Sequence, residues 1–118
     1  MIALVVKTHV SHYPDPITLS KGDLVQIGRR YEGPEGWDNW LYCKRSSPDQ
    51  EGWVPEQIIQ IKDETGIILE DYCANELNVE PGERLIGLRE LNGWLWCQHE
   101  TTEELGWVPL ANIDKISE

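Results

Sequence analysis

The sequence contains no phenylalanine, one methionine and only three cysteines. No apolar run approaches the roughly 18 residues that a membrane-spanning helix needs, so a membrane protein is not expected. Basic residues are also scarce: 10 Lys and Arg stand against 21 Asp and Glu, which gives a formal net charge of −11. Because a chain of this charge is repelled by phosphate backbones and anionic lipids, we expect neither nucleic acid nor a membrane surface as its partner.

The cysteines Cys43, Cys73 and Cys97 cannot all pair with one another, and neither C-x-x-C spacing nor a neighbouring His cluster predicts a zinc site. We interpret them as buried thiols in a reducing compartment. The apolar N-terminus, residues 1–7, lacks the basic leader of a secretion signal and is interpreted as a first strand. The predicted location is therefore cytoplasmic, and no cofactor or metal is expected.

An internal repeat is the strongest feature that the sequence does contain. Trp40-Leu41-Tyr42-Cys43 aligns with Trp94-Leu95-Trp96-Cys97, and Gly52-Trp53-Val54-Pro55 with Gly106-Trp107-Val108-Pro109, both at an offset of 54 residues. A second alignment, at an offset of 60, sets residues 17–23 against residues 77–83. Repeats of this kind decide the domain organisation. We predict two units, residues 1–61 and 67–118, joined by a linker of residues 62–66.

Each repeat has the pattern of short strands and turns, without sustained helical periodicity. Lys21-Gly22-Asp23 and Pro81-Gly82-Glu83 predict tight turns, and Asn92-Gly93 predicts a hairpin. The strand that begins at Trp40 alternates, which places Leu41 and Cys43 on the face opposite Trp40 and Tyr42. The predicted fold class is all-β, with five short strands in each repeat closing into a small barrel.

Both halves resemble Src-homology-3 (SH3) domains, in particular the divergent variants of bacterial proteins. The resemblance is carried by an opening strand (Ala3-Leu4, and Ile68-Leu69-Glu70-Asp71-Tyr72), a turn with Gly-Asp or Gly-Glu, a Trp-led third strand, and Gly-Trp-Val-Pro before one helical turn. It covers residues 2–61 and 67–117. It implies two consecutive SH3-like five-stranded barrels that form a non-enzymatic protein-interaction module for an extended, proline-rich or basic peptide.

The resemblance also implies which residues line a peptide groove. The groove Trp is Trp40 in the first copy and Trp94 in the second, and the groove Pro is Pro55 and Pro109. We expect these Trp rings to be exposed in the groove, because the alternating Leu and Cys positions already supply inward residues; core packing is the alternative.

Tyrosine is missing from most of the other groove positions that the resemblance implies. These positions hold Val5, Lys7 and Ile58 in the first copy, and Glu70, Tyr72 and Asn112 in the second. Only Tyr72 keeps its ring, so the second copy is the better candidate for ligand binding. Tyr13, in the loop of residues 7–16, is a candidate steric substitute in the first copy.

Charge separates the two copies further. Residues 1–61 carry a net charge of −2 and residues 62–118 one of −9. Glu70, Asp71 and Glu76 lie in or beside the loop that supplies carboxylates to a ligand Arg or Lys in SH3 domains. They predict a basic anchor on the partner; the alternative is an acidic surface that only aids solubility.

Other functions receive less support from the sequence. His9, His12 and His99 accompany no recognisable catalytic motif, so we interpret them as surface residues and assign no catalytic residue. Two alternatives remain: an SH3-like module that binds cell-wall peptide, and a structural tandem barrel without groove activity. The linker reaches only ~17 Å when extended, so we expect the two domains to pack on each other.

Overall fold

The computed structural model describes the whole chain except residues 12–14, 36, 47–48 and 118. Its regular elements are strands and two single turns of 3₁₀ helix. In chain order they are β1 (Ile2–Val5), β2 (Thr18–Leu19), β3 (Leu24–Arg30), β4 (Trp40–Ser46), β5 (Asp49–Pro55), η1 (Glu56–Ile58), β6 (Ile59–Lys62), β7 (Thr65–Ile68), β8 (Tyr72–Cys73), β9 (Arg84–Leu91), β10 (Trp94–His99), β11 (Leu105–Pro109), η2 (Leu110–Asn112) and β12 (Ile113–Ser117). The predicted all-β class is confirmed.

The strands form two five-stranded sheets, in the orders β5-β4-β3-β7-β6 and β11-β10-β9-β1-β12, and a two-stranded pair of β2 with β8. Every strand pair is antiparallel. In each sheet a 3₁₀ turn joins the third strand of a meander to the next strand, as β5-η1-β6 and β11-η2-β12. This is the architecture of an SH3-like barrel, as predicted.

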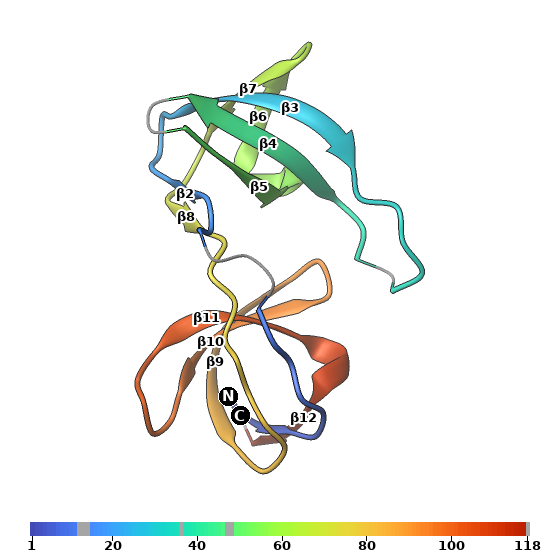
Figure 1. Cartoon of the computed structure of the whole chain (residues 1–118), viewed down its shortest axis with the longest axis vertical. Coiled ribbons are helices and arrows are strands. Elements are labelled where there is room, and N and C mark those ends of the chain that lie inside the picture. Colours follow the sequence, from blue (N-terminus) through green and yellow to red (C-terminus); the bar gives the residue numbers. More distant parts are fainter. Residues whose placement is uncertain (12–14, 36, 47–48, 118) are drawn as a thin grey trace. The chain divides into compact units, whose positions relative to one another are not determined.

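The two repeats exchange their opening strands. The chain divides into unit 1, which contains Met1–Pro14 and Asn75–Glu118, and unit 2, which contains Asp15–Ala74. β1 pairs with β9 and β12 of the second repeat, whereas β7 pairs with β3 and β6 of the first. In Figure 1 the blue β1 accordingly lies among the orange and red strands of unit 1. The units thus differ from the predicted boundaries 1–61 and 67–118.

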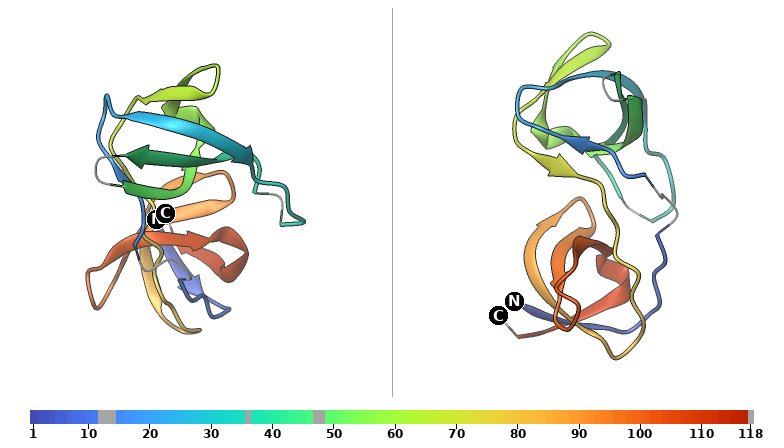
Figure 2. Two further views of the ribbon diagram at one scale, coloured as in Figure 1. Left: turned by 45° about the horizontal axis from the view of Figure 1, so that its top comes forward. Right: turned by 60° about the vertical axis from the view of Figure 1, so that its left-hand side comes forward.

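Both chain ends belong to unit 1. Ile2 of β1 lies opposite Ser117 of β12, so the first and last strands of the chain are antiparallel neighbours. Both views of Figure 2 show the two ends meeting at this edge.

The predicted linker, residues 62–66, is a hairpin inside unit 2. Lys62 lies opposite Thr65, which leaves Asp63 and Glu64 as a two-residue turn, and Asp63 adopts a positive φ of 56°. Two-residue turns join antiparallel neighbours directly. The short connection therefore pairs β7 with β6, instead of starting a new barrel.

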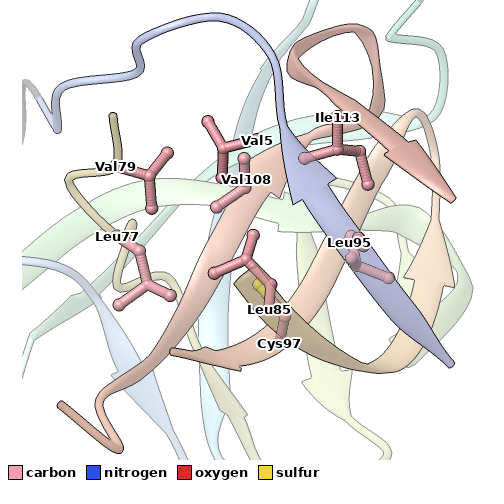
Figure 3. Packing of buried hydrophobic residues seen from close by; sticks show 9 residues of the cluster. Val5, Leu77, Val79, Leu85, Leu95, Cys97, Val108 and Ile113 are labelled. Carbon is pink, nitrogen blue, oxygen red and sulfur yellow. The ribbon is translucent and has the colours of Figure 1, made fainter. Parts of the chain in front are cut away.

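Each unit has its own apolar core, and the exchanged strands contribute to it. Ala3 and Val5 of β1 are buried in the core of unit 1 with Leu85, Leu95 and Val108 of the second repeat, as Figure 3 shows for this core. The core of unit 2 consists of Ile17, Leu19, Val25, Leu41, Cys43, Val54, Ile58, Ile59 and Ile68. Because burying one aliphatic side chain contributes about 1.5–3 kcal/mol, Val5 and Ile68 help to hold the exchanged strands in place.

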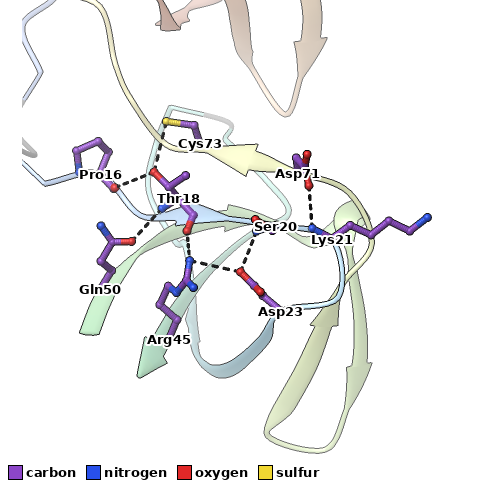
Figure 4. A network of polar contacts seen from close by, with 9 residues as sticks. All are labelled: Pro16, Thr18, Ser20, Lys21, Asp23, Arg45, Gln50, Asp71 and Cys73. Atoms are coloured by element: carbon purple, nitrogen blue, oxygen red, sulfur yellow. Dashed lines mark hydrogen bonds and ion pairs between the residues drawn. The ribbon is translucent and has the colours of Figure 1, made fainter. Parts of the chain in front are cut away.

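The predicted turns before β3 and β9 are confirmed. Gly22 and Gly82 adopt φ values of 94° and 95°, which favour glycine. In unit 2 the Asp23 carboxylate accepts the Ser20 N–H at 2.8 Å and pairs with Arg45 at 3.3 Å. Figure 4 shows this network, in which Arg45 also donates to the Thr18 carbonyl.

The exchange also redistributes the charge. Counted over the observed units, unit 2 carries six basic and 12 acidic residues, net −6, and unit 1 carries four and nine, net −5. The concentration of acidity in the second repeat therefore does not correspond to one acidic unit, since the acidic residues 63, 64, 70 and 71 belong to unit 2.

Candidate functional site

Backbone hydrogen bonds define which positions of the two units are equivalent. The Val5 N–H donates to the Glu83 carbonyl at 2.9 Å, and the Ile68 N–H donates to the Asp23 carbonyl at 2.9 Å. Val5 therefore corresponds to Ile68, and Ala3 corresponds to Gly66. The alignment of Ala3 with Ile68 was wrong by two residues.

The corrected register changes which residues stand at the tyrosine positions of the first repeat. His9 lies opposite Val79, as Tyr72 lies opposite Leu19 in the other unit. The two positions are thus Lys7 and His9, not Val5 and Lys7. His9 was missed in the sequence, although Val5-Val6-Lys7-Thr8-His9 has the same apolar start as Ile68-Leu69-Glu70-Asp71-Tyr72.

Because of the exchange, the predicted groove residues are distributed between the two units differently from their distribution between the two repeats. Unit 2 contains Trp40, Pro55, Glu70, Asp71 and Tyr72. Unit 1 contains Glu76, Trp94, Pro109 and Asn112, whereas Tyr13 lies outside the described residues. The acidic and aromatic residues at 70–72, predicted to act with Trp94, thus lie in the unit of Trp40.

Most of these groove positions are buried. Trp40 is 6% exposed and Trp94 is 9% exposed, although both were expected in an exposed groove. Pro55 and Pro109 are buried too, and Asn112 is 8% exposed. Both Trp rings are therefore largely covered by other parts of the chain.

In unit 1 the segment that follows β1 covers the predicted groove. The His9 ring meets Trp94 edge to face, with ring centroids 5.5 Å apart, and its Nε2 bonds to the Glu76 carboxylate at 2.8 Å. The Asn112 side chain donates to the Lys7 and Thr8 carbonyls at 3.3 and 3.0 Å. Glu76 and Asn112, both predicted to bind ligand, are therefore bonded within the unit.

The backbone of β11 in unit 1 is also hydrogen-bonded within the unit. The Trp107 N–H donates to the Asn75 carbonyl at 2.8 Å, and the Leu77 N–H donates to the Trp107 carbonyl at 3.1 Å. Trp107 also packs on Trp96, with ring centroids 5.3 Å apart, and is only 6% exposed.

In unit 2 the equivalent position carries Tyr72, whose contact is different. Its hydroxyl donates to the Trp53 carbonyl at 2.9 Å. Asp71, predicted to meet a ligand cation, accepts the Lys21 N–H at 2.8 Å and so supports the turn before β3 (Figure 4). Glu70 is half-buried and has a partner of its own.

Four half-buried rings of unit 2, Tyr31, Trp37, Tyr42 and Trp53, form what we call the aromatic platform. Tyr42 of β4 lies directly opposite Trp53 of β5, with ring centroids 5.1 Å apart and an interplanar angle of 78°. Tyr31 meets Trp53 edge to face at 5.3 Å and lies 5.7 Å from Trp37.

A cation and two carboxylates belong to the aromatic platform. The Arg29 guanidinium lies 4.8 Å from the centre of the Tyr42 ring and 5.2 Å from that of Trp53. Glu51 accepts the Tyr42 hydroxyl at 2.8 Å, and Glu35 accepts the Tyr31 hydroxyl at 2.7 Å. Ring faces beside carboxylates attract cations, so the platform is suited to a guanidinium or an ammonium group.

The sequence contains two signals for this platform. Tyr42 and Trp53 belong to the paired strands of the repeat, so their alternation places them on the outer face. Trp37 lies between residues 30 and 40, a segment six residues longer than its counterpart in the second repeat, because the alignment offset falls from 60 to 54.

In the part of the chain that the structure describes, no group of three or more His, Cys, Asp or Glu side chains is placed to hold a metal ion. None of the described helices has the length and hydropathy of a membrane span. Cys43 and Cys97 are buried, as predicted, and burial raises the pKa of each thiol to about 12. Cys73 is only half-buried.

Comparison with known proteins supports the interpretation of the fold. The comparisons with curated proteins and with solved structures found no match. The family described as variant SH3 domain matches residues 2–62, which is the whole first repeat up to the end of β6. Because that match spans more than half of the 118 residues, the chain belongs to the variant SH3 domain family.

Proposed function

We propose that unit 2 binds an extended peptide segment that carries a basic side chain, and that the aromatic platform holds the basic group. The single observation that carries this proposal is the position of Arg29 over the Tyr42 and Trp53 rings. The Arg29 guanidinium already lies on these ring faces, which supports their assignment as a cation-binding surface; a basic group of the ligand binds there by displacing Arg29.

Family membership and charge support the same proposal. SH3 domains are in general protein-interaction modules without catalytic activity, and peptides in a polyproline conformation are well suited to aromatic surfaces because they lose little entropy on binding. The net charge of −6 on unit 2 favours a basic partner and accelerates its association.

We assign unit 1 a structural role, and we also propose that it is a second SH3 domain. The equivalent backbone hydrogen bonds in the two units support the second assignment. The structural role rests on His9 and Glu76, which occupy the surface of Trp94 that a ligand would need.

The proposal is tested by titrating the isotope-labelled chain with a proline-rich peptide that contains one arginine, followed by NMR. A second peptide carries citrulline, a neutral isostere, at the same position. We expect shifts at Tyr42, Trp53 and Tyr31, and a dissociation constant that is about 2–30 times higher for the citrulline peptide. Equal affinity for both peptides, or shifts confined to unit 1, contradicts the proposal.

Two matched variants separate the platform from the other unit. Trp37→Ala removes one ring of the platform, whereas Trp96→Ala removes a half-buried ring from unit 1. Trp37→Ala should weaken arginine-peptide binding several-fold, and Trp96→Ala should leave it unchanged. The reverse result would assign the ligand to unit 1.

A further inference from the structure

We propose that side chains specify the exchange of opening strands. Each opening strand occupies a position between two other strands, which we call its seat. The seat between β9 and β12 in unit 1 favours residues 1–11 of this sequence over residues 64–74. The seat between β3 and β6 in unit 2 has the opposite preference. The two segments make equivalent backbone hydrogen bonds at Val5 and Ile68, and at Met1 and Glu64, so a preference between the seats arises where their side chains differ.

The first such position is Ala3 in one segment and Gly66 in the other. A Cβ atom at Gly66 would lie 2.4 Å from Ile59 Cγ2 and 3.2 Å from Ile27 Cδ1. Ala3 carries that Cβ atom, so β1 in the seat of unit 2 would collide with a buried isoleucine. Overpacking of this kind destabilises a closely packed core.

At the second position the glycine belongs to the seat and the larger side chain belongs to the opening segment. The counterpart of Ile27 in unit 1 is Gly87, and a Cβ atom there would lie 2.7 Å from Met1 Cε. The Met1 side chain thus uses the space that Gly87 leaves open, packed against the core of unit 1. The β7 segment has Glu64 at this position. Its carboxylate would replace a thioether among apolar groups, which costs desolvation energy.

The third position concerns Thr8 and its equivalent, Asp71. In unit 1 the Thr8 hydroxyl donates to the Glu80 carboxylate at 2.9 Å, and in unit 2 Asp71 accepts the Lys21 N–H at 2.8 Å. The residue equivalent to Lys21 is Pro81, which has no N–H to donate. Asp71 in the seat of unit 1 would therefore lose its donor and face the Glu80 carboxylate.

All three positions favour the same arrangement. In the seat of the other unit, β1 would meet a steric collision, and the β7 segment would meet a desolvated charge and a like charge. Specificity is such a difference between the affinities for two sites. The turn at Asp63 and Glu64 joins β6 to β7 in the same arrangement. The experiment must therefore separate the effect of the side chains from that of the short turn.

Cross-strand disulfides report which seat β1 occupies in the full chain. Leu4 lies opposite Arg84 in unit 1, and it would lie opposite Leu24 if β1 took the place of β7 in unit 2, where Leu24 lies opposite Ile67. The variants Leu4→Cys/Arg84→Cys and Leu4→Cys/Leu24→Cys are prepared with Cys73→Ser, which removes the half-buried native thiol. After mild oxidation of the monomer, mass spectrometry of linked peptides should show the first link and not the second.

The decisive version of this experiment inserts about 12 Gly and Ser residues between Asp63 and Glu64, a length that behaves as a flexible tether. If the side chains specify the exchange, the link between positions 4 and 84 persists in the lengthened chain. A dominant link between positions 4 and 24 overturns the proposal, because the turn alone would then set the exchange. The absence of both links also contradicts it, since β1 would have left its seat.

Reversing the first position gives the converse experiment. In the lengthened chain, Ala3→Gly with Gly66→Ala gives β1 the shape that fits unit 2 and gives β7 the shape that fits unit 1. The ratio of the 4–24 link to the 4–84 link should rise several-fold over that of the lengthened chain alone. An unchanged ratio would show that the shape of these two residues does not select the seat.

Discussion

The two units share one fold but differ at one equivalent surface position. In unit 1 that position is His9, which covers Trp94 and is held there by Glu76. In unit 2 it is Tyr72, which bonds to the Trp53 carbonyl, and the ring of Trp53 stays half-buried beneath Arg29. The same backbone position therefore covers a Trp ring in unit 1 and supports a strand carbonyl in unit 2.

A second difference lies in the turns before β3 and β9. In unit 2 the turn carboxylate, Asp23, pairs with the Arg45 guanidinium at 3.3 Å. In unit 1 the corresponding Glu83 pairs with His99 at 3.1 Å. The two turns therefore differ in the partner of their carboxylate, which is a guanidinium in unit 2 and an imidazole in unit 1.

The largest expected effect concerns thiol reactivity, which provides one reporter for each unit. At pH 8, iodoacetamide should alkylate Cys73 orders of magnitude faster than Cys43 and Cys97, because the pKa of the two buried thiols is raised to about 12. Mass spectrometry should find one modified cysteine in the native chain and three in urea. Rapid native labelling of Cys43 or Cys97 would contradict the burial of that core.

The next largest effect tests the exchange of strands. Ile68→Ala should destabilise unit 2 by about 2–5 kcal/mol, because Ile68 is fully buried in that core although it belongs to the second repeat. In low urea the variant should expose Cys43 and leave Cys97 protected.

The matched control is Ile67→Ala, a change at the neighbouring residue, which is 42% exposed and should have little effect. Increased labelling of Cys97 in the Ile68→Ala variant would place β7 in the other unit.

A smaller effect is expected at His99. Its Nδ1 accepts the N–H groups of Thr101 and Thr102 at 3.1 and 3.2 Å, and its Nε2 faces Glu83. His99→Phe keeps a buried ring but loses these bonds, so it should destabilise unit 1 by roughly 1–3 kcal/mol. Urea unfolding followed by Cys97 labelling measures this loss. The control, Arg45→Met in unit 2, should affect Cys43 labelling instead; a loss shared equally by both units would show that they unfold together.

The sequence was sufficient for the fold class, the repeat and the turns, because these depend on local patterns. Gly22 and Gly82 have the positive φ that their motifs predict, and Leu41 and Cys43 face the core as their alternation predicts. The exchange of strands could not be predicted in the same way, since β1 and β7 make equivalent backbone hydrogen bonds and a local pattern does not show which sheet each strand joins.

The candidate site was predictable only in part. The Ala3-Leu4 pair resembles the start of the family motif, and Ala3 and Val5 both face the core. A shift of two residues keeps the same face inward, so the burial pattern did not reveal that His9 is the counterpart of Tyr72. The residues at 70–72 were recognised in the sequence but were grouped with Trp94. Their neighbours depend on long-range strand pairing, which a local motif does not report.

The smallest expected effect sharpens the comparison of the two turns. The Glu80 N–H, and after it His99, lower the pKa of the Glu83 carboxyl. A carboxyl whose pKa is lower in the folded state stabilises that state above the pKa of the unfolded chain, about 4.3, and this stabilisation is lost as the pH falls through the folded value. Glu83→Gln should therefore lower the urea midpoint of unit 1 slightly at pH 7 and flatten its decline below pH 4.5, compared with Glu104→Gln, which changes an exposed carboxylate of the same unit. An equally steep acid decline in both variants would assign the acid sensitivity of unit 1 to other carboxylates.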